Sequence, residues 1–141
     1  MTGDTRPSQA HPERCAIASD TDLSIAITSL RHWLLARGFD NGEAARIMTA
    51  ASEIGRNILK YAGHGHLQFQ SAYRDLKRGI EVSAIDQGPG IEDVEAAMRD
   101  RFSTSGTLGL GLPGVKRLVD EFEIRSAPGK GTRATFRLWH R

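Results

Sequence analysis

The sequence has one cysteine, no long hydrophobic run and little net charge, and each shortage excludes a class of protein. Cys15 has no second thiol with which to form an internal disulfide or a zinc motif, so we expect it to be a buried strand residue. No run approaches the roughly 20 apolar residues that a membrane-spanning helix needs, and the N-terminus is polar where a signal peptide would be apolar. These absences predict a cytoplasmic protein with no membrane partner.

Neither sign of charge is present in large excess. The formal net charge is +2 despite a pI near 9.0, and the basic residues are scattered apart from Lys116, Arg117 and the C-terminus. Nucleic acid is therefore not expected as a partner. The length of 141 residues fits one domain with its own core. Residues 1–12 contain Pro7 and Pro12 and predict a flexible lead-in, and residues 13–141 form the predicted domain.

Two long helices are predicted in the first half of the domain. Apolar residues recur at helical spacing from Leu23 to Leu34, after a cap at Asp20 or Thr21 and before Gly38. A second apolar stripe runs through residues 42–62, with Asn41 as its cap and Gly63 as its end.

Strands make up most of the rest. A first short strand is predicted at 14–19, one hairpin at 66–73 and 79–85, and a closing hairpin at 122–126 and 132–139. Short helices are predicted at 91–99 and 112–120. Helices that come before and between antiparallel strands indicate an α/β two-layer sandwich, with the helices packed on one face of a mixed, mainly antiparallel sheet.

The second helix carries the first candidate for chemistry. Glu53 and Asn57 are four residues apart and share one helix face at the edge of the core, with Lys60 beside them. A carboxylate, an amide oxygen and an ammonium together could supply a base, a magnesium ligand and a phosphate contact. Taken alone, this group is more often explained by solvated helix positions at Glu53 and Lys60, with Asn57 incidental.

The second candidate follows the apolar strand that ends at Ile85. Asp86 could accept hydrogen bonds from an exocyclic amine such as that of adenine, while Gly88 and Gly90 let the backbone turn beneath a flat base. An ordinary Gly-Pro turn would give the same residues, so this stretch decides little by itself.

The third candidate is the glycine-rich stretch 102–112, which leads into a predicted helix. Glycines allow backbone amides to approach phosphate oxygens, and the helix N-terminus adds unpaired N–H groups. Gly109, Gly111 and Gly114 also match the G-x-G-x-x-G pattern of dinucleotide-binding proteins. That motif needs an apolar strand before it and an acidic residue about 20 positions later, and the sequence has neither. A Walker A loop is absent as well. The fourth candidate, Thr132 after a Gly-Lys-Gly turn, could support Asp86 or simply cap a hairpin.

In order and spacing, the four stretches resemble the N box and the three glycine boxes of GHKL (Bergerat-fold) ATPases. The matching residues are Glu53-x-x-x-Asn57-x-x-Lys60-Tyr61, Asp86-x-Gly88-x-Gly90, Gly109-Leu110-Gly111-Leu112 and Gly129-x-Gly131-Thr132. Within that superfamily, residues 86–91, 102–106, 112–118 and 120–122 most resemble the serine/threonine switch kinases of bacterial stressosome modules. The resemblance covers nearly the whole chain after residue 13.

The resemblance implies a role for each matched residue, with ATP and Mg²⁺ as cofactors. Asn57 would ligate Mg²⁺, Glu53 would take the proton of the attacking hydroxyl, and Asp86 would bind the adenine amino group with Thr132 beside it. Lys60 would add a phosphate contact. The other positions of the implied nucleotide pocket and phosphate lid are Gly88, Gly90, Gly106, Gly109, Leu110, Gly111 and Leu112.

The resemblance also implies a substrate and two partners. The family phosphorylates a serine or threonine on a STAS-domain protein, and the released kinase regulates a PP2C-type phosphatase upstream of a sigma factor. Two rivals remain open. The chain could be an anti-sigma factor that binds ATP without transferring phosphate and acts by sequestration, or a nicotinamide-binding enzyme built on Gly109, Gly111 and Gly114.

Overall fold

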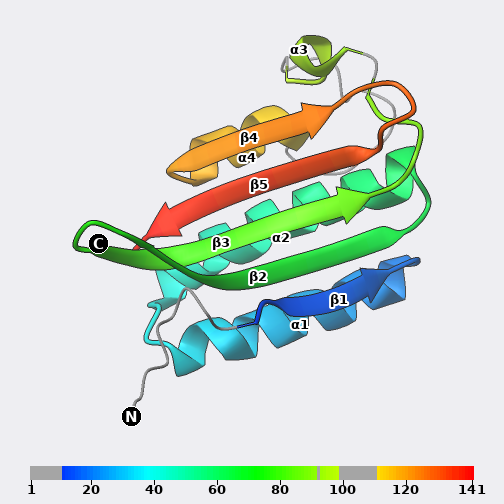
Figure 1. Cartoon of the computed structure of the whole chain (residues 1–141). Helices are drawn as coiled ribbons and strands as arrows, with labels where there is room; N and C mark the ends of the chain where they lie inside the picture. The colour runs from blue at the N-terminus through cyan, green and yellow to red at the C-terminus, as the bar shows by residue number, and fades with distance from the viewer. Residues whose placement is uncertain (1–10, 92, 99–110) are drawn as a thin grey trace.

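The computed structural model describes residues 11–91, 93–98 and 111–141 of the chain. In Figure 1 a five-stranded sheet lies in front and the three longer helices lie behind it, with strand order β1-β2-β3-β5-β4. The elements are β1 Glu13–Ile17, α1 Asp20–Ala36, α2 Asn41–Tyr61, β2 Gly65–Arg74, β3 Lys77–Asp86, α3 Val94–Ala97, α4 Gly111–Leu118, β4 Glu121–Ser126 and β5 Thr132–Trp139.

The predicted two-layer sandwich is confirmed. Helices α1, α2 and α4 cover one face of the sheet, and the fully buried side chains Leu34, Ile54, Phe69 and Phe136 lie between the layers. All the pairings between the described strands are antiparallel, so the parallel component that a mixed sheet would contain is absent from them. The opposite face of the sheet carries no helix within the described part of the chain, which leaves its alternating side chains facing outward.

The N-caps of both long helices come earlier in the chain than the residues predicted to cap them. Ser19 is the N-cap of α1 and accepts a hydrogen bond from the N–H of Asp22, so the expected cap at Asp20 or Thr21 is wrong. Asp40 is the N-cap of α2, where Asn41 was expected. Asp40 and Glu43 form a reciprocal capping box, which satisfies two helix-end donors and which a lone Asn41 could not provide.

The two hairpins set the positions of the residues predicted to bind nucleotide. β2 and β3 pair along their whole lengths, and β3 then pairs with β5, which places Asp86 opposite Thr132. β4 pairs with the other edge of β5 and places Ser126 opposite Thr132. The strand ends that carry Asp86, Ser126 and Thr132 therefore meet at one end of the sheet.

Two smaller expectations need correction. Cys15 is half-buried because β1 is an edge strand, where full burial was expected. The short helix predicted at 91–99 is the four-residue α3, and positions 92 and 99 lie outside the described residues. A side-chain contact also joins β1 to β2, since the half-buried His66 accepts a hydrogen bond at Nε2 from Arg14 Nη2 over 2.7 Å.

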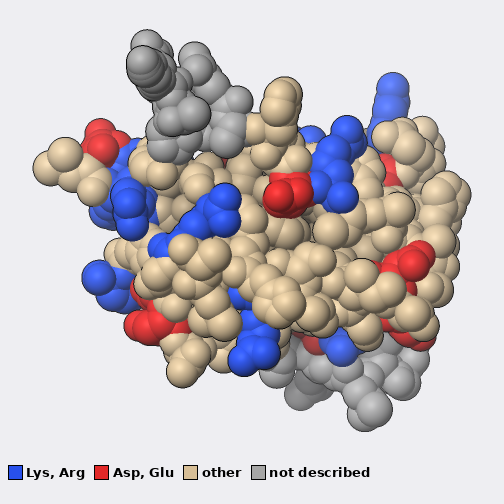
Figure 2. Space-filling view, turned by 90° about the horizontal axis from the view of Figure 1, so that it is seen from below, with Lys and Arg blue, Asp and Glu red and all other residues tan. Residues whose placement is uncertain are grey.

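The surface agrees with a small net charge. Seen from below, basic and acidic side chains are interspersed over a mostly uncharged surface (Figure 2). Among the described residues no helix is long and apolar enough to cross a bilayer, and no three histidine, cysteine or acidic side chains gather as they would around a metal ion.

Candidate functional site

Glu53 is the acidic side chain that α2 holds against the start of α4. It is 7% exposed, and its two carboxylate oxygens have different partners. Oε1 accepts a hydrogen bond from Arg56 Nη1 over 2.7 Å, and Oε2 accepts one from the backbone N–H of Gly111 over 2.9 Å. The carboxylate is therefore fixed in orientation, with one oxygen at the positive end of a helix.

Asn57 and Lys60 follow Glu53 along the same side of α2. Asn57 is half-buried and Lys60 is exposed, and the Lys60 Nζ lies 5.4 Å from the centre of the Tyr61 ring. Asn57 is one helical turn, about 6 Å, beyond Glu53. Its amide oxygen is a hard ligand of the kind that Mg²⁺ accepts, and one or two protein oxygens are sufficient when phosphates complete the coordination.

Asp86 ends β3 inside the protein, with 6% of its surface exposed. Its Oδ1 accepts the N–H of Gly88 over 2.9 Å. No donor among the described residues reaches its Oδ2, so one oxygen of a buried carboxylate lacks a protein partner there. A buried acceptor without a donor is energetically costly, and an adenine amino group would satisfy it.

Two glycines allow the backbone to pack this closely around Asp86. A Cβ on Gly88 would lie 2.5 Å from the Cβ of Ala62, directly after the end of α2. A Cβ on Gly131 would lie 2.3 Å from the carbonyl oxygen of Asp86, and the positive φ of 74° at Gly131 also favours glycine. The first and third glycine boxes therefore meet at Asp86 because neither turn tolerates a side chain.

Ser126 ties the same strand ends together, although the sequence analysis assigned it no role. Its Oγ accepts the N–H of Ile91 over 2.6 Å, donates to the carbonyl of Gly131 over 3.0 Å, and lies 2.8 Å from the Oγ1 of Thr132. Arg56 is the other residue that was missed. Its three-residue spacing from Glu53 was visible in the sequence, and such pairs face each other on a helix.

The described parts of the motifs converge along α2. In its C-terminal half, Gly111 contacts Glu53 and Gly88 packs against Ala62, just after the helix end. Glu53 and Ala62 are about 14 Å apart along the helix axis, and Asn57 lies between them. Gly90 has a positive φ of 84° and packs against Ala127. Leu112 is 4% exposed and belongs to the core, so it could reach a nucleotide through its backbone alone. Gly106, Gly109 and Leu110 lie outside the described residues.

Comparison with known proteins identifies the family of the chain. The family model of the histidine kinase-like ATPase domain matches residues 17–138. The chain is 50% identical over 104 residues to the serine/threonine-protein kinase RsbT of Bacillus subtilis, a match that covers 74% of this chain and 78% of the relative. It is 41% identical over 96 residues to the anti-sigma F factor of Caldanaerobacter subterraneus, which covers 64% of this chain and 66% of that relative.

A solved structure agrees in fold. The crystal structure of the RsbU and RsbW domains of a Mycobacterium tuberculosis protein superposes with a TM-score of 0.64 at 23% identity, covering 94% of this chain and 33% of that one. The identity with the Bacillus kinase confirms the expected class of enzyme, a serine/threonine protein kinase. The chain thus belongs to the histidine kinase-like ATPase family, in the branch that contains serine/threonine switch kinases and anti-sigma factors.

Proposed function

We propose that this chain transfers the terminal phosphoryl group of Mg-ATP to a serine or threonine of a STAS-domain protein in a cytoplasmic bacterial partner-switching module. When released from that protein, it regulates a PP2C-type phosphatase. Two observations at opposite ends of the C-terminal half of α2 carry the proposal. The carboxylate of Glu53 is held beside the Gly111 N–H at one end, and the buried Asp86 of β3, near the other end, has an oxygen without a donor among the described residues.

Each residue contributes a separate part of the reaction. Asp86 Oδ2 accepts the adenine amino group, with Thr132 beside it, and Gly88 and Gly90 shape the turn beneath the base. Asn57 ligates Mg²⁺, which neutralises the phosphate charge that builds up during transfer. Lys60 adds a positive charge next to the phosphates. The remaining lid positions, Gly106, Gly109 and Leu110, are proposed to give backbone N–H groups to the phosphate oxygens.

The Gly111 N–H connects phosphate binding to the base. A phosphate oxygen that takes this donor displaces Glu53 Oε2, while Arg56 keeps hold of Oε1. The freed oxygen can then accept the proton of the substrate hydroxyl. The hydroxyl oxygen forms the new bond to the γ-phosphorus as the bond to the β-phosphate bridging oxygen breaks, and ADP is the leaving group.

The anti-sigma reading remains the alternative, and it rests on the 41% identity with an anti-sigma F factor. In that case the same pocket would hold ATP to maintain a binding surface, and the partner would be sequestered. The two readings differ in what happens to the γ-phosphate, which makes them separable by one experiment.

The test is incubation with γ-labelled ATP, Mg²⁺ and a purified STAS-domain protein. The proposal predicts acid-stable label on a serine or threonine of that protein, and a fall of about 10²- to 10⁴-fold in the transfer rate for Glu53→Gln, with ATP still bound. Asp75→Asn, at an exposed position in the β2–β3 turn, is the matched control and should transfer normally. ATP binding without transfer to any STAS protein would favour sequestration.

A further inference from the structure

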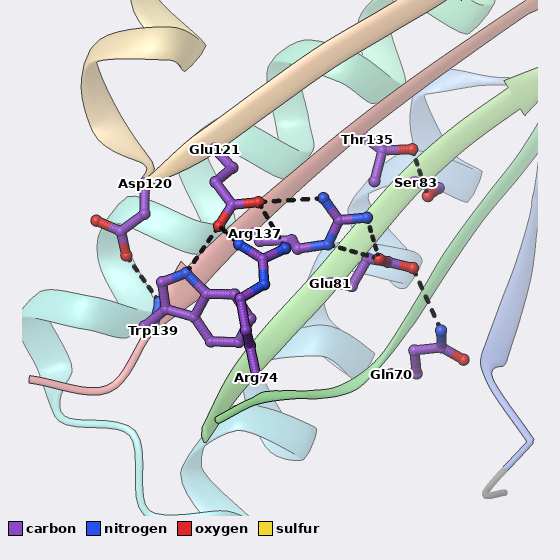
Figure 3. A network of polar contacts seen from close by, with 9 residues as sticks. All are labelled: Gln70, Arg74, Glu81, Ser83, Asp120, Glu121, Thr135, Arg137 and Trp139. Atoms are coloured by element: carbon purple, nitrogen blue, oxygen red, sulfur yellow. Dashed lines mark hydrogen bonds and ion pairs between the residues drawn. The ribbon is translucent and has the colours of Figure 1, made fainter. Parts of the chain in front are cut away.

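The two ends of the outward face of the sheet differ in their balance of charged side chains. At the end nearest the β2–β3 turn, Glu81 and Glu121 are paired with Arg74 and Arg137, and Figure 3 shows this network in front of the strands. Arg137 bridges the two acids, with Nη2 2.7 Å from Glu81 and Nη1 3.3 Å from Glu121. Positive and negative charges balance there.

The other end of the same face carries positive charge without that balance. Arg133 comes four residues before Arg137 on β5, so its side chain points to the same side of the sheet. Arg125 lies directly opposite Arg133 on β4. Arg125, Lys130 and Arg133 are all exposed and line a cavity of about 340 Å³ at the strand ends. None of the three makes an ion pair with another described residue.

Acidic groups near this cavity do not cancel its charge. Asp86 borders the cavity, but it is only 6% exposed, and alternation along β3 turns its side chain to the helix-covered face, away from Arg133. Glu123 lies on the same face and shares a smaller hollow of about 150 Å³ with Arg125 and Arg133, yet it forms no ion pair with either within the described residues. Three cations thus face one exposed carboxylate.

The positive charge continues across the sheet. His66 lies opposite Ile85, Ile85 lies opposite Arg133, and Arg133 lies opposite Arg125, so these residues form one row. Arg14 on β1 extends the row through its hydrogen bond to His66. The pKa of His66 is lowered by burial and by the charges of Arg14 and Arg133, as expected for a site of positive potential. The row spans all five strands, about 19 Å.

We propose that this row and its cavity form a docking surface for an extended, acidic segment of a partner protein. A length of about 19 Å matches roughly six residues of extended chain, which is too long for a single phosphate ion. A nucleic acid would need a broad positive field, whereas this chain has a net charge of +2 and charges of both signs are interspersed on the view in Figure 2. An acidic peptide segment fits both the length and the narrowness of the row.

The test uses a fluorescein-labelled peptide of about eight residues with glutamate at every second position, and a matched peptide with glutamine in those places. Fluorescence anisotropy should show binding of the glutamate peptide alone, weakening as ionic strength rises from about 0.05 to 0.15 M. The double variant Arg125→Glu/Arg133→Glu should weaken binding by at least about tenfold. The control Arg31→Glu/Lys77→Glu makes the same change in net charge at exposed positions away from the row, and should alter affinity by less than about twofold.

Several results would overturn the proposal. They are an absence of peptide binding at low salt, an equal loss in the control variant, tighter binding of a DNA duplex at the same salt, or displacement of the peptide by inorganic phosphate at equal concentration. Two milder variants, Lys130→Ala and Arg133→Gln, keep the test valid if the double variant misfolds, because neither side chain contributes an internal contact of the fold within the described residues. If both variants melt like the parent chain and bind the peptide unchanged, the row is not the docking surface.

Discussion

The backbone N–H of Gly111 donates a hydrogen bond to Oε2 of Glu53 over 2.9 Å, so the proposed general base occupies a donor that the proposed phosphate site also needs. Glu53 and the phosphates therefore compete for one amide. This competition, together with the negative charge of Glu53, opposes nucleotide binding in the resting site.

Removing the Glu53 side chain should consequently tighten ATP binding. We expect Glu53→Ala to bind Mg-ATP about three- to tenfold more strongly, because a competing anion worth on the order of 1 kcal/mol has been removed. Titration calorimetry on the parent chain and the variant measures the difference. A weaker affinity in a variant that melts normally would show that Glu53 supports nucleotide binding directly.

Asp86→Asn should have the opposite effect. An amide offers the adenine amino group a poorer acceptor and brings a competing donor, so the affinity for ATP should fall by about 1–3 kcal/mol. Asp75→Asn is the matched control, since Asp75 lies in the β2–β3 turn with a positive φ of 55° that asparagine tolerates. Equal ATP affinity in Asp86→Asn and the parent chain would remove the adenine assignment.

Ser126→Ala should loosen the nucleotide end of the sheet. The change leaves the Ile91 N–H and the Gly131 carbonyl without the hydroxyl that joins them, so the free energy of unfolding should fall by about 1–3 kcal/mol and ATP binding should weaken with it. Urea unfolding with and without ATP measures both effects. Ser29→Ala, at an exposed position on α1, should change neither, and an equally stable Ser126→Ala would argue against the role of Ser126 as a link.

The polar network on the outward face predicts a loss of stability in acid. Burial alone would raise the pKa of Glu121, but hydrogen bonds from Arg74, Trp139 and Arg137 and the charge of Arg74 outweigh it and lower the pKa. A lowered pKa stabilises the folded state above the ordinary glutamate value, and this contribution disappears as the pH falls through the lowered value.

The stability advantage of the parent chain over Glu121→Gln should therefore be full at pH 7 and shrink between about pH 5 and pH 3. Urea unfolding at several pH values in that window measures it. Glu123→Gln is the control, because Glu123 is exposed and lies outside the network. A gap between the parent chain and Glu121→Gln that stays constant down to pH 3 would contradict this account.

Local patterns in the sequence predicted the elements and their layering well. The stripe along α2 and the glycines after Ile85 and Lys130 indicated where each motif lies, since helix periodicity and turn chemistry are local properties. The helix caps were predicted one or two residues too late, because Ser19 and Asp40 stand next to other residues that can also cap a helix. The half-burial of Cys15 was missed because strand order, which leaves β1 at an edge, depends on long-range pairing.

The contacts within the site were harder to predict. The ion pair of Arg56 with Glu53 follows from helical spacing and could have been found. The links of Ser126 to Ile91 and Thr132 depend on the β4–β5 register and on a turn from another part of the chain, and no local pattern contains them. The positive row on the outward face is likewise visible only after the strands are placed in order.

A crystal structure with Mg²⁺ and a non-hydrolysable ATP analogue would show whether one nucleotide lies along α2, with its base against Asp86 and its phosphates near Glu53. We expect adenine against Asp86, a metal ion on Asn57, and a phosphate oxygen in place of Glu53 Oε2 on the Gly111 N–H. A nucleotide bound elsewhere, or one that leaves the contact between Glu53 and Gly111 intact, would contradict this expectation.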